Sequence, residues 1–366
     1  MSFGLRSKFV LCAVFLSSSI PWISAQELPT KRDSDAPPAA KTTPTSKTGD
    51  DYHEDFSSIF LRGSTFFPLP PALGQVDDSP RFSFVRERWQ LMWRPADPID
   101  LFICKPKGVT KPPVIFFLYT SPGTTDRFKS DDWCGTTTAS GFAAVGFVSA
   151  YTGHRLEMRA PTATFFTDFQ ESLGATVHDV QLILDYLATR GDLDMNRVGM
   201  YGQGSGGTIA ILASAADARI KALDVLTPWG DWPSFFSESR FIGKDARAKY
   251  ASPEFLSRVA SLEPLEWLPK VKAKSVRMQN VRKSGPMPDR LQERLEAAAP
   301  PIASINQYGD PGALVPRAAG GALFDWLRAQ LQPETKPQVA VDKSERIHFY
   351  PAENENPLPP LGPPNH

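Results

Sequence analysis

Cysteine and histidine are scarce in this sequence, with three and five copies among 366 residues. The cysteines form no C-x-x-C pair and the histidines do not recur at metal-ligand spacing, so the sequence predicts no metal site and no bound cofactor. Net charge is also missing, because 40 lysines and arginines balance 40 aspartates and glutamates. This balance removes the electrostatic reason to expect nucleic acid or an anionic membrane as a partner.

The N-terminus has the residue order of an export signal. Arg6 and Lys8 precede a short apolar run, and the small residues at 23–25 suit a cleavage site. We expect a signal peptide at 1–25 that is removed, which makes the mature protein secreted or periplasmic. An uncleaved membrane anchor is the alternative, although the run is short for a bilayer and Pro21 interrupts its extension. No later segment is long and apolar enough to predict a transmembrane helix.

Two of the three cysteines remain once the signal is removed. These are Cys104 and Cys134. Export to an oxidising compartment permits a disulfide, but the sequence alone leaves open whether these two residues are close in space.

Composition divides the rest of the chain. Residues 26–55 are rich in proline, lysine, threonine and serine, which predicts a disordered linker. Residues 56–87 form an N-terminal extension, and 332–366 form a proline-rich tail that we expect to be extended and mostly disordered. A folded domain is therefore expected at 88–331.

Within that domain the apolar pattern alternates between strand and helix. A hairpin is expected first, followed by strands that alternate with helices, which indicates a mainly parallel sheet with helices on both faces. One predicted helix has an apolar face that includes Val177 and Leu184, while His178 and Asp179 fall on its other face. The predicted strands are at 88–93, 99–104, 114–119, 141–149, 198–201, 222–226, 275–279 and 303–306, and the predicted helices at 177–187, 208–216 and 323–331.

The most informative segment is 197–207, Arg-Val-Gly-Met-Tyr-Gly-Gln-Gly-Ser-Gly-Gly, which reads as a strand, a tight turn and a helix start. Together with the helix before it, this segment resembles the nucleophile elbow of the α/β-hydrolase superfamily, closest to the dienelactone-hydrolase and prolyl-oligopeptidase-like branches. The resemblance covers 88–331. It implies an α/β-hydrolase fold, and for the family it implies hydrolysis of esters, lactones or amides. It also implies that the aromatic-rich residues 229–270 are a lid-like insertion.

The resemblance implies a catalytic serine, acid and histidine, and this sequence departs from all three. In the elbow motif G-x-S-x-G, Gly202 and Gly206 take the outer positions and Gly204 takes the place of the serine. Lys283 and Ser284 stand where the acid is expected, and no histidine occurs between residues 179 and 347. The sequence therefore predicts a non-catalytic or very weak hydrolase homologue with a ligand-binding or structural role.

Other interpretations remain open. An active serine hydrolase would need a displaced nucleophile, Ser205, with Asp231 and His154 as partners; otherwise these residues are a packed serine, a turn or capping aspartate and a solvated histidine. Backbone N–H groups at Ser205 and near Thr120 and Ser121 could form an oxyanion niche for a small carboxylate or ester ligand. In a third interpretation, the proline-rich tails bind partners in the cell envelope and the domain is a rigid body.

Overall fold

The computed structural model describes residues 52–66, 69–119, 125–152, 155, 168–283, 285–314, 322–331 and 347–350. The predicted signal peptide, and most of the predicted linker and tail, lie outside these residues. Within them, no helix is both long enough and apolar enough to cross a membrane.

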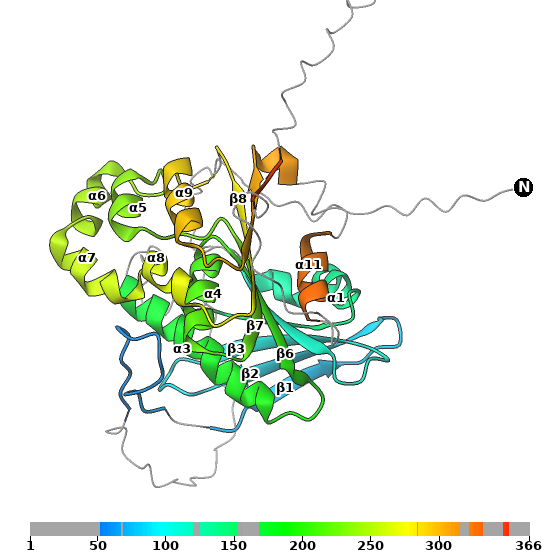
Figure 1. The fold of residues 1–366 in the computed structure, drawn as a ribbon. Helices are drawn as coiled ribbons and strands as arrows, with labels where there is room; N and C mark the ends of the chain where they lie inside the picture. Colours follow the sequence, from blue (N-terminus) through cyan, green and yellow to red (C-terminus); the bar gives the residue numbers. More distant parts are fainter. Residues whose placement is uncertain are drawn as a thin grey trace, which may run out of the picture.

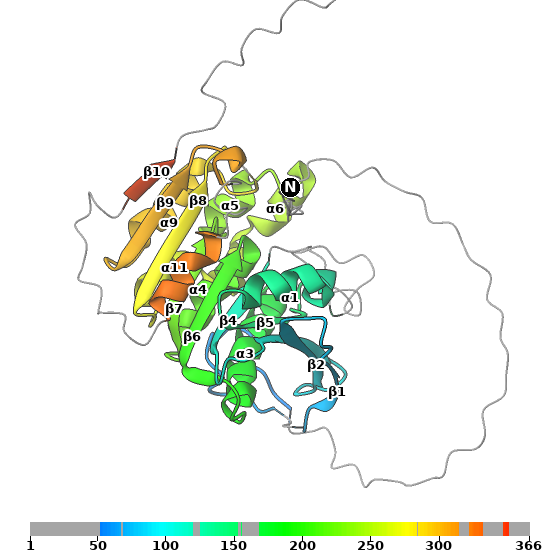
Figure 2. The same ribbon diagram turned by 90° about the vertical axis from the view of Figure 1, so that its right-hand side faces the viewer.

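One ten-stranded sheet forms the centre of the molecule, in the order β1-β2-β3-β5-β4-β6-β7-β8-β9-β10 (Figures 1 and 2). Strands β1, β2 and β3 are antiparallel neighbours and β3 is antiparallel to β5, whereas every other pair is parallel. The predicted hairpin and the predicted parallel sheet are both confirmed. The strands are β1 (Ala72–Asp77), β2 (Phe84–Leu91), β3 (Ile99–Pro106), β4 (Pro113–Leu118), β5 (Ala143–Phe147), β6 (Asp194–Gln203), β7 (Ile220–Leu226), β8 (Ser275–Val281), β9 (Ala303–Tyr308) and β10 (Ile347–Tyr350).

Helices cover both faces of the sheet, as the pattern predicts. Helices α1 and α11 lie on one face, and α3 to α9 lie on the other (Figures 1 and 2). The central strand β4 is continuously apolar because both of its faces pack against helices. The helical segments are η2 (Thr125–Lys129), α1 (Asp131–Thr138), α3 (Phe169–Ala188), α4 (Ser205–Ala216), α5 (Trp232–Glu238), α6 (Lys244–Tyr250), α7 (Pro253–Val259), η3 (Ala260–Leu262), α8 (Pro264–Trp267), η4 (Leu268–Lys270), α9 (Asp289–Ala298) and α11 (Ala322–Gln330).

The folded unit extends beyond the predicted limits of 88–331 at both ends. Strand β1 and the start of β2 lie in the predicted N-terminal extension, and β10 pairs in parallel with β9. The expectation that the tail lacks structure is therefore wrong at residues 347–350. The alternation of Ile347 and Phe349 is too short to indicate a strand among the surrounding proline and polar residues.

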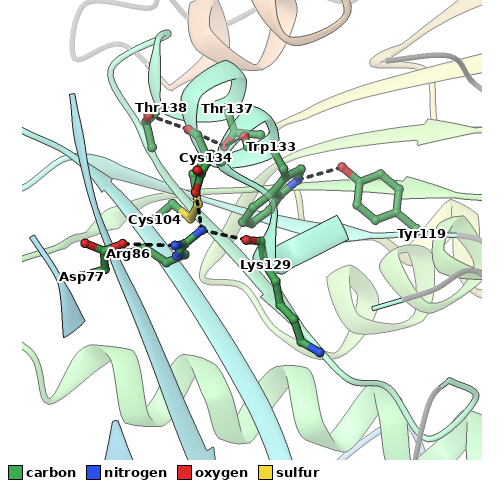
Figure 3. Close-up of a disulfide and its surroundings, with 10 residues drawn as sticks. Asp77, Arg86, Cys104, Tyr119, Lys129, Trp133, Cys134, Thr137 and Thr138 are labelled. Carbon is green, nitrogen blue, oxygen red and sulfur yellow. Dashed lines mark hydrogen bonds and ion pairs between the residues drawn. A yellow bond between two sulfur atoms is a disulfide. The ribbon is translucent and has the colours of Figure 1, made fainter. Parts of the chain in front are cut away.

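A disulfide joins the antiparallel part of the sheet to the first helix. Cys104 in β3 and Cys134 in α1 are both fully buried, with their Cα atoms 5.5 Å apart (Figure 3). The question that the sequence left open is thereby answered, since these two cysteines are paired.

A buried ionic network fixes residues 52–66 against helix α3. Glu54 accepts hydrogen bonds from Arg94, whose Nη2 lies 2.7 Å from Oε1. Arg94 also pairs with Asp179, and Asp179 accepts a 2.7 Å hydrogen bond from Arg155. Arg155 in turn donates two hydrogen bonds to Asp97, of 2.8 and 2.7 Å. The network therefore links three carboxylates and two guanidinium groups, and only the Asp97 carboxylate among them is partly exposed to water.

His178 completes this network. Its Nδ1 lies 2.7 Å from Oε1 of Glu54 and its Nε2 lies 2.9 Å from the carbonyl oxygen of Ser58. The carbonyl oxygen of Ser58 can only accept, so Nε2 donates to it, and the ring is held between α3 and residues 52–66. The sequence pattern placed His178 and Asp179 on a polar helix face, but both side chains are fully buried, because residues 52–66 cover that face.

Candidate functional site

The elbow lies where β6 ends and α4 begins, and Gly204 is the single residue between them. Its φ of 55° and ψ of −121° fall in a region that residues with a side chain adopt only at a cost. The Gly204 N–H donates to the carbonyl oxygen of Leu226 (2.9 Å), and its own carbonyl oxygen accepts from the N–H of Thr208 (3.1 Å). The turn is thus tied to β7 on one side and to the first turn of α4 on the other.

The outer glycines of the motif are required by close backbone approach. A Cβ atom on Gly202 would lie 2.5 Å from the carbonyl oxygen of Gly206, and one on Gly206 would lie 2.3 Å from the carbonyl oxygen of Leu118. Both distances are shorter than any van der Waals contact, so the backbone would have to move. Helix α4 therefore packs directly against β4 and β6, with its N-terminus at the carboxyl ends of these strands.

Ser205 is buried at the start of a helix, and Asp231 forms an ion pair with a neighbouring helix. Ser205 is the first residue of α4 and is 3% exposed. Asp231 precedes α5, and its carboxylate is paired with Arg294 of α9. The Asp231 N–H donates to Oε1 of Glu263 (2.8 Å). The expected capping role is not seen, because the Asp231 side chain makes no cap hydrogen bond and forms an ion pair instead. His154, Thr120 and Ser121 lie outside the described residues.

In the turns after β8 and β9, the polar groups form hydrogen bonds with nearby residues of the protein. After β8, the Arg282 guanidinium donates to both oxygens of Glu296, at 2.8 and 2.9 Å, and the Lys283 N–H donates to Asp289 (2.9 Å). After β9, the carboxylate of Asp310 accepts from the N–H of Ala313 (3.0 Å). Asp310 therefore stabilises the turn in which it lies, and Ser284 lies outside the described residues.

The aromatic-rich insertion at 229–270 forms a packed subdomain of short helices. Trp229 and Trp232 are each 1% exposed, and the indole N–H of Trp232 donates to the carbonyl oxygen of Leu262 (3.1 Å). Phe241 is the exception, because it is 43% exposed and its ring centre lies 5.5 Å from that of Trp229. Most of the aromatic side chains of this insertion are therefore buried in a core that they share with the sheet and with α3, where Phe169 contacts Trp232 and Phe236.

A scan against family models and a search of curated proteins found no match to the sequence. The fold, in contrast, matches many solved structures. An acetyl xylan esterase from Paenibacillus sp. is 18% identical with a TM-score of 0.54, and the match covers 71% of this chain and 89% of the esterase. Acetyl xylan esterase 1 from Thermoanaerobacterium sp. is 13% identical with a TM-score of 0.56, and the match covers 72% of this chain and 89% of the esterase.

A third similar structure is the acylaminoacyl peptidase from Pyrococcus horikoshii, at 17% identity and a TM-score of 0.52, with 72% of this chain and 44% of the peptidase covered. The strand order, the elbow between β6 and α4 and the helices on both faces agree with these likenesses. The chain therefore has the fold of the α/β-hydrolase superfamily.

Proposed function

We propose that this protein is an exported α/β-hydrolase homologue without serine-hydrolase activity, and that it has a ligand-binding or structural role. The observation that supports this most directly is Gly204. It has the strained backbone conformation at the centre of the elbow, but it offers no hydroxyl group to act as a nucleophile. The elbow geometry thus persists without the side chain that serine-hydrolase chemistry needs.

The neighbouring turns support the same proposal. A nucleophile is activated by a base, and the base is oriented by a third group. Asp231 is paired with Arg294, and Asp310 accepts a hydrogen bond from the N–H of Ala313. Both of these carboxylates therefore already have a structural partner. The ligand class that we assign to the elbow is a small carboxylate or ester, because the N-terminus of the 12-residue helix α4 attracts negative charge there.

The catalytic half of this proposal predicts that the purified protein does not hydrolyse nitrophenyl esters. Gly204→Ser should not restore turnover, because a serine alone lacks an activating base. The same substitution should lower the free energy of unfolding by about 1–3 kcal/mol, since serine is strained at this φ. Initial rates and urea unfolding curves of wild type and variant measure both effects.

The second candidate is an active serine hydrolase that uses Ser205, and the names of the similar structures favour it, since they are esterases and a peptidase. A fluorophosphonate probe separates the two candidates. Labelling of the wild type that disappears in Ser205→Ala, together with ester turnover, would establish the displaced nucleophile and overturn our proposal. An unlabelled but folded wild type supports it.

Export rests on the N-terminal residue order and on the disulfide, because disulfides persist mainly in oxidising compartments. We expect the mature protein, expressed in its own host, to begin near Gln26 and to be recovered outside the cytoplasm. N-terminal sequencing of protein from fractionated cells measures this. Full-length protein that starts at Met1 in the cytoplasmic fraction would contradict it.

A further inference from the structure

A cavity of about 310 Å³ lies on strands β1 to β3. The sheet order separates these strands from the elbow strand β6 by β5 and β4, so the cavity is distinct from the elbow. Its volume is at the lower end of the range for pockets that bind small molecules. The cavity is named the β1 groove, and the residues that line it are Gln75, Val76, Asp77, Arg86, Arg88, Phe102 and Lys129.

Arg86 fixes the shape of the β1 groove. Its Nη1 donates to the carbonyl oxygen of Lys129 (2.7 Å) and to Asp131 (2.8 Å), and its Nη2 donates to Asp77 (3.2 Å) (Figure 3). These contacts join β1 to η2 and α1, and the disulfide at Cys104 holds α1 to the sheet nearby (Figure 3). The wall of the groove is therefore fixed before a ligand arrives, and the charge of Arg86 is neutralised by its two acidic partners.

Arg88 keeps hydrogen-bond donors for a ligand. Its side chain is 45% exposed, and among the described residues only its Nη2 donates a hydrogen bond, of 3.1 Å, to Asp100. Gln75 is the direct cross-strand neighbour of Arg88, and its exposed amide makes no hydrogen bond within the described part of the chain. The guanidinium of Arg88 and the amide of Gln75 thus lie side by side, and both have N–H groups that can donate to a ligand.

Phe102 lines the groove beside these donors. It is the cross-strand partner of Arg88 in β3, and the guanidinium carbon of Arg88 lies 5.9 Å from the centre of its ring. Planar guanidinium donors match the two oxygens of a carboxylate.

We propose that the β1 groove binds a small monocarboxylate. Arg88 and Gln75 donate hydrogen bonds to the carboxylate oxygens, and Arg86 positions the wall. This site does not depend on the role proposed for the elbow.

Isothermal titration calorimetry of the full mature chain with butanoate tests the proposal, and butanamide serves as the uncharged analogue. We expect butanoate to bind and butanamide not to bind. Arg88→Gln should weaken butanoate binding about 10- to 100-fold, the range for losing a charged hydrogen bond. Gln75→Leu should weaken it less. The matched control is Arg328→Gln, which removes an exposed arginine with a single ion pair, to Asp325, and should leave binding unchanged.

Several results would overturn the proposal. These are no butanoate binding by the wild type, equal affinity for butanamide, or unchanged affinity in Arg88→Gln. A Gly204→Ser titration separates the two sites, because binding that is lost in Gly204→Ser but kept in Arg88→Gln takes place at the elbow. That outcome would support the ligand of the elbow and reject the β1 groove.

Discussion

Glu54→Gln should lower the free energy of unfolding by about 3–5 kcal/mol, the range for removing one partner from a buried ion pair. The Glu54 carboxylate is fully buried and accepts from Arg94, His178 and Tyr52. A neutral amide in its place removes one of the two buried carboxylates that pair with Arg94, the other being Asp179, and offers one acceptor oxygen instead of two. Urea unfolding at neutral pH measures the loss.

The same residue predicts how stability changes with pH. Burial alone would raise the pKa of Glu54, but hydrogen bonds from Arg94 and His178 outweigh it and lower the pKa to about 2, against an ordinary value of 4.5. A lowered folded-state pKa stabilises the protein above the unfolded-state value, and this contribution disappears as the pH falls from about 4.5 towards 2. It amounts to about 3 kcal/mol for this difference in pKa.

Unfolding curves at several pH values between 7 and 2 should therefore show a steeper acid loss in wild type than in Glu54→Gln. Glu254→Gln is the matched control, because this glutamate is exposed on α7 and should behave as wild type. If Glu54→Gln and wild type lose stability with the same slope, the network does not hold the N-terminal segment as described.

Removal of the disulfide has the second large effect. The free energy of unfolding of the double variant Cys104→Ala, Cys134→Ala should be about 3–4 kcal/mol lower than that of wild type. The reason is that the crosslink closes a loop with a sequence separation of 30 and restricts the unfolded chain. Urea unfolding with and without reductant measures it. Reductant added to the unfolded wild type should reproduce the loss, and it should not affect the double variant. Equal stability of wild type and double variant would contradict the prediction.

The sequence was a good guide where structure depends on neighbouring residues. The elbow was recognisable because Gly202, Gly204 and Gly206 mark a turn whose backbone excludes side chains, and the apolar run at 114–119 marked a strand buried on both faces. The parallel sheet followed from the alternation of such segments. All of these signals are contained within a few residues.

The remaining features depend on pairs that are far apart in the chain. Glu54 meets His178 across 124 positions and Arg94 meets Asp179 across 85. In a single sequence, nothing distinguishes a charged residue that finds a distant partner from one that faces water. The same reason left the pairing of Cys104 with Cys134 open, and it left β10 hidden in a tail of unfavourable composition.

The ionic network also bears on the order of folding events. Glu54 is synthesised long before Arg94 and His178, and until α3 has formed it has no buried partner to bind. Contacts between such distant residues tend to form late, and interactions that are absent from the folding transition state chiefly slow unfolding. We therefore expect residues 52–66 to have little influence on how fast the protein folds and to extend the lifetime of the folded state once they are bound.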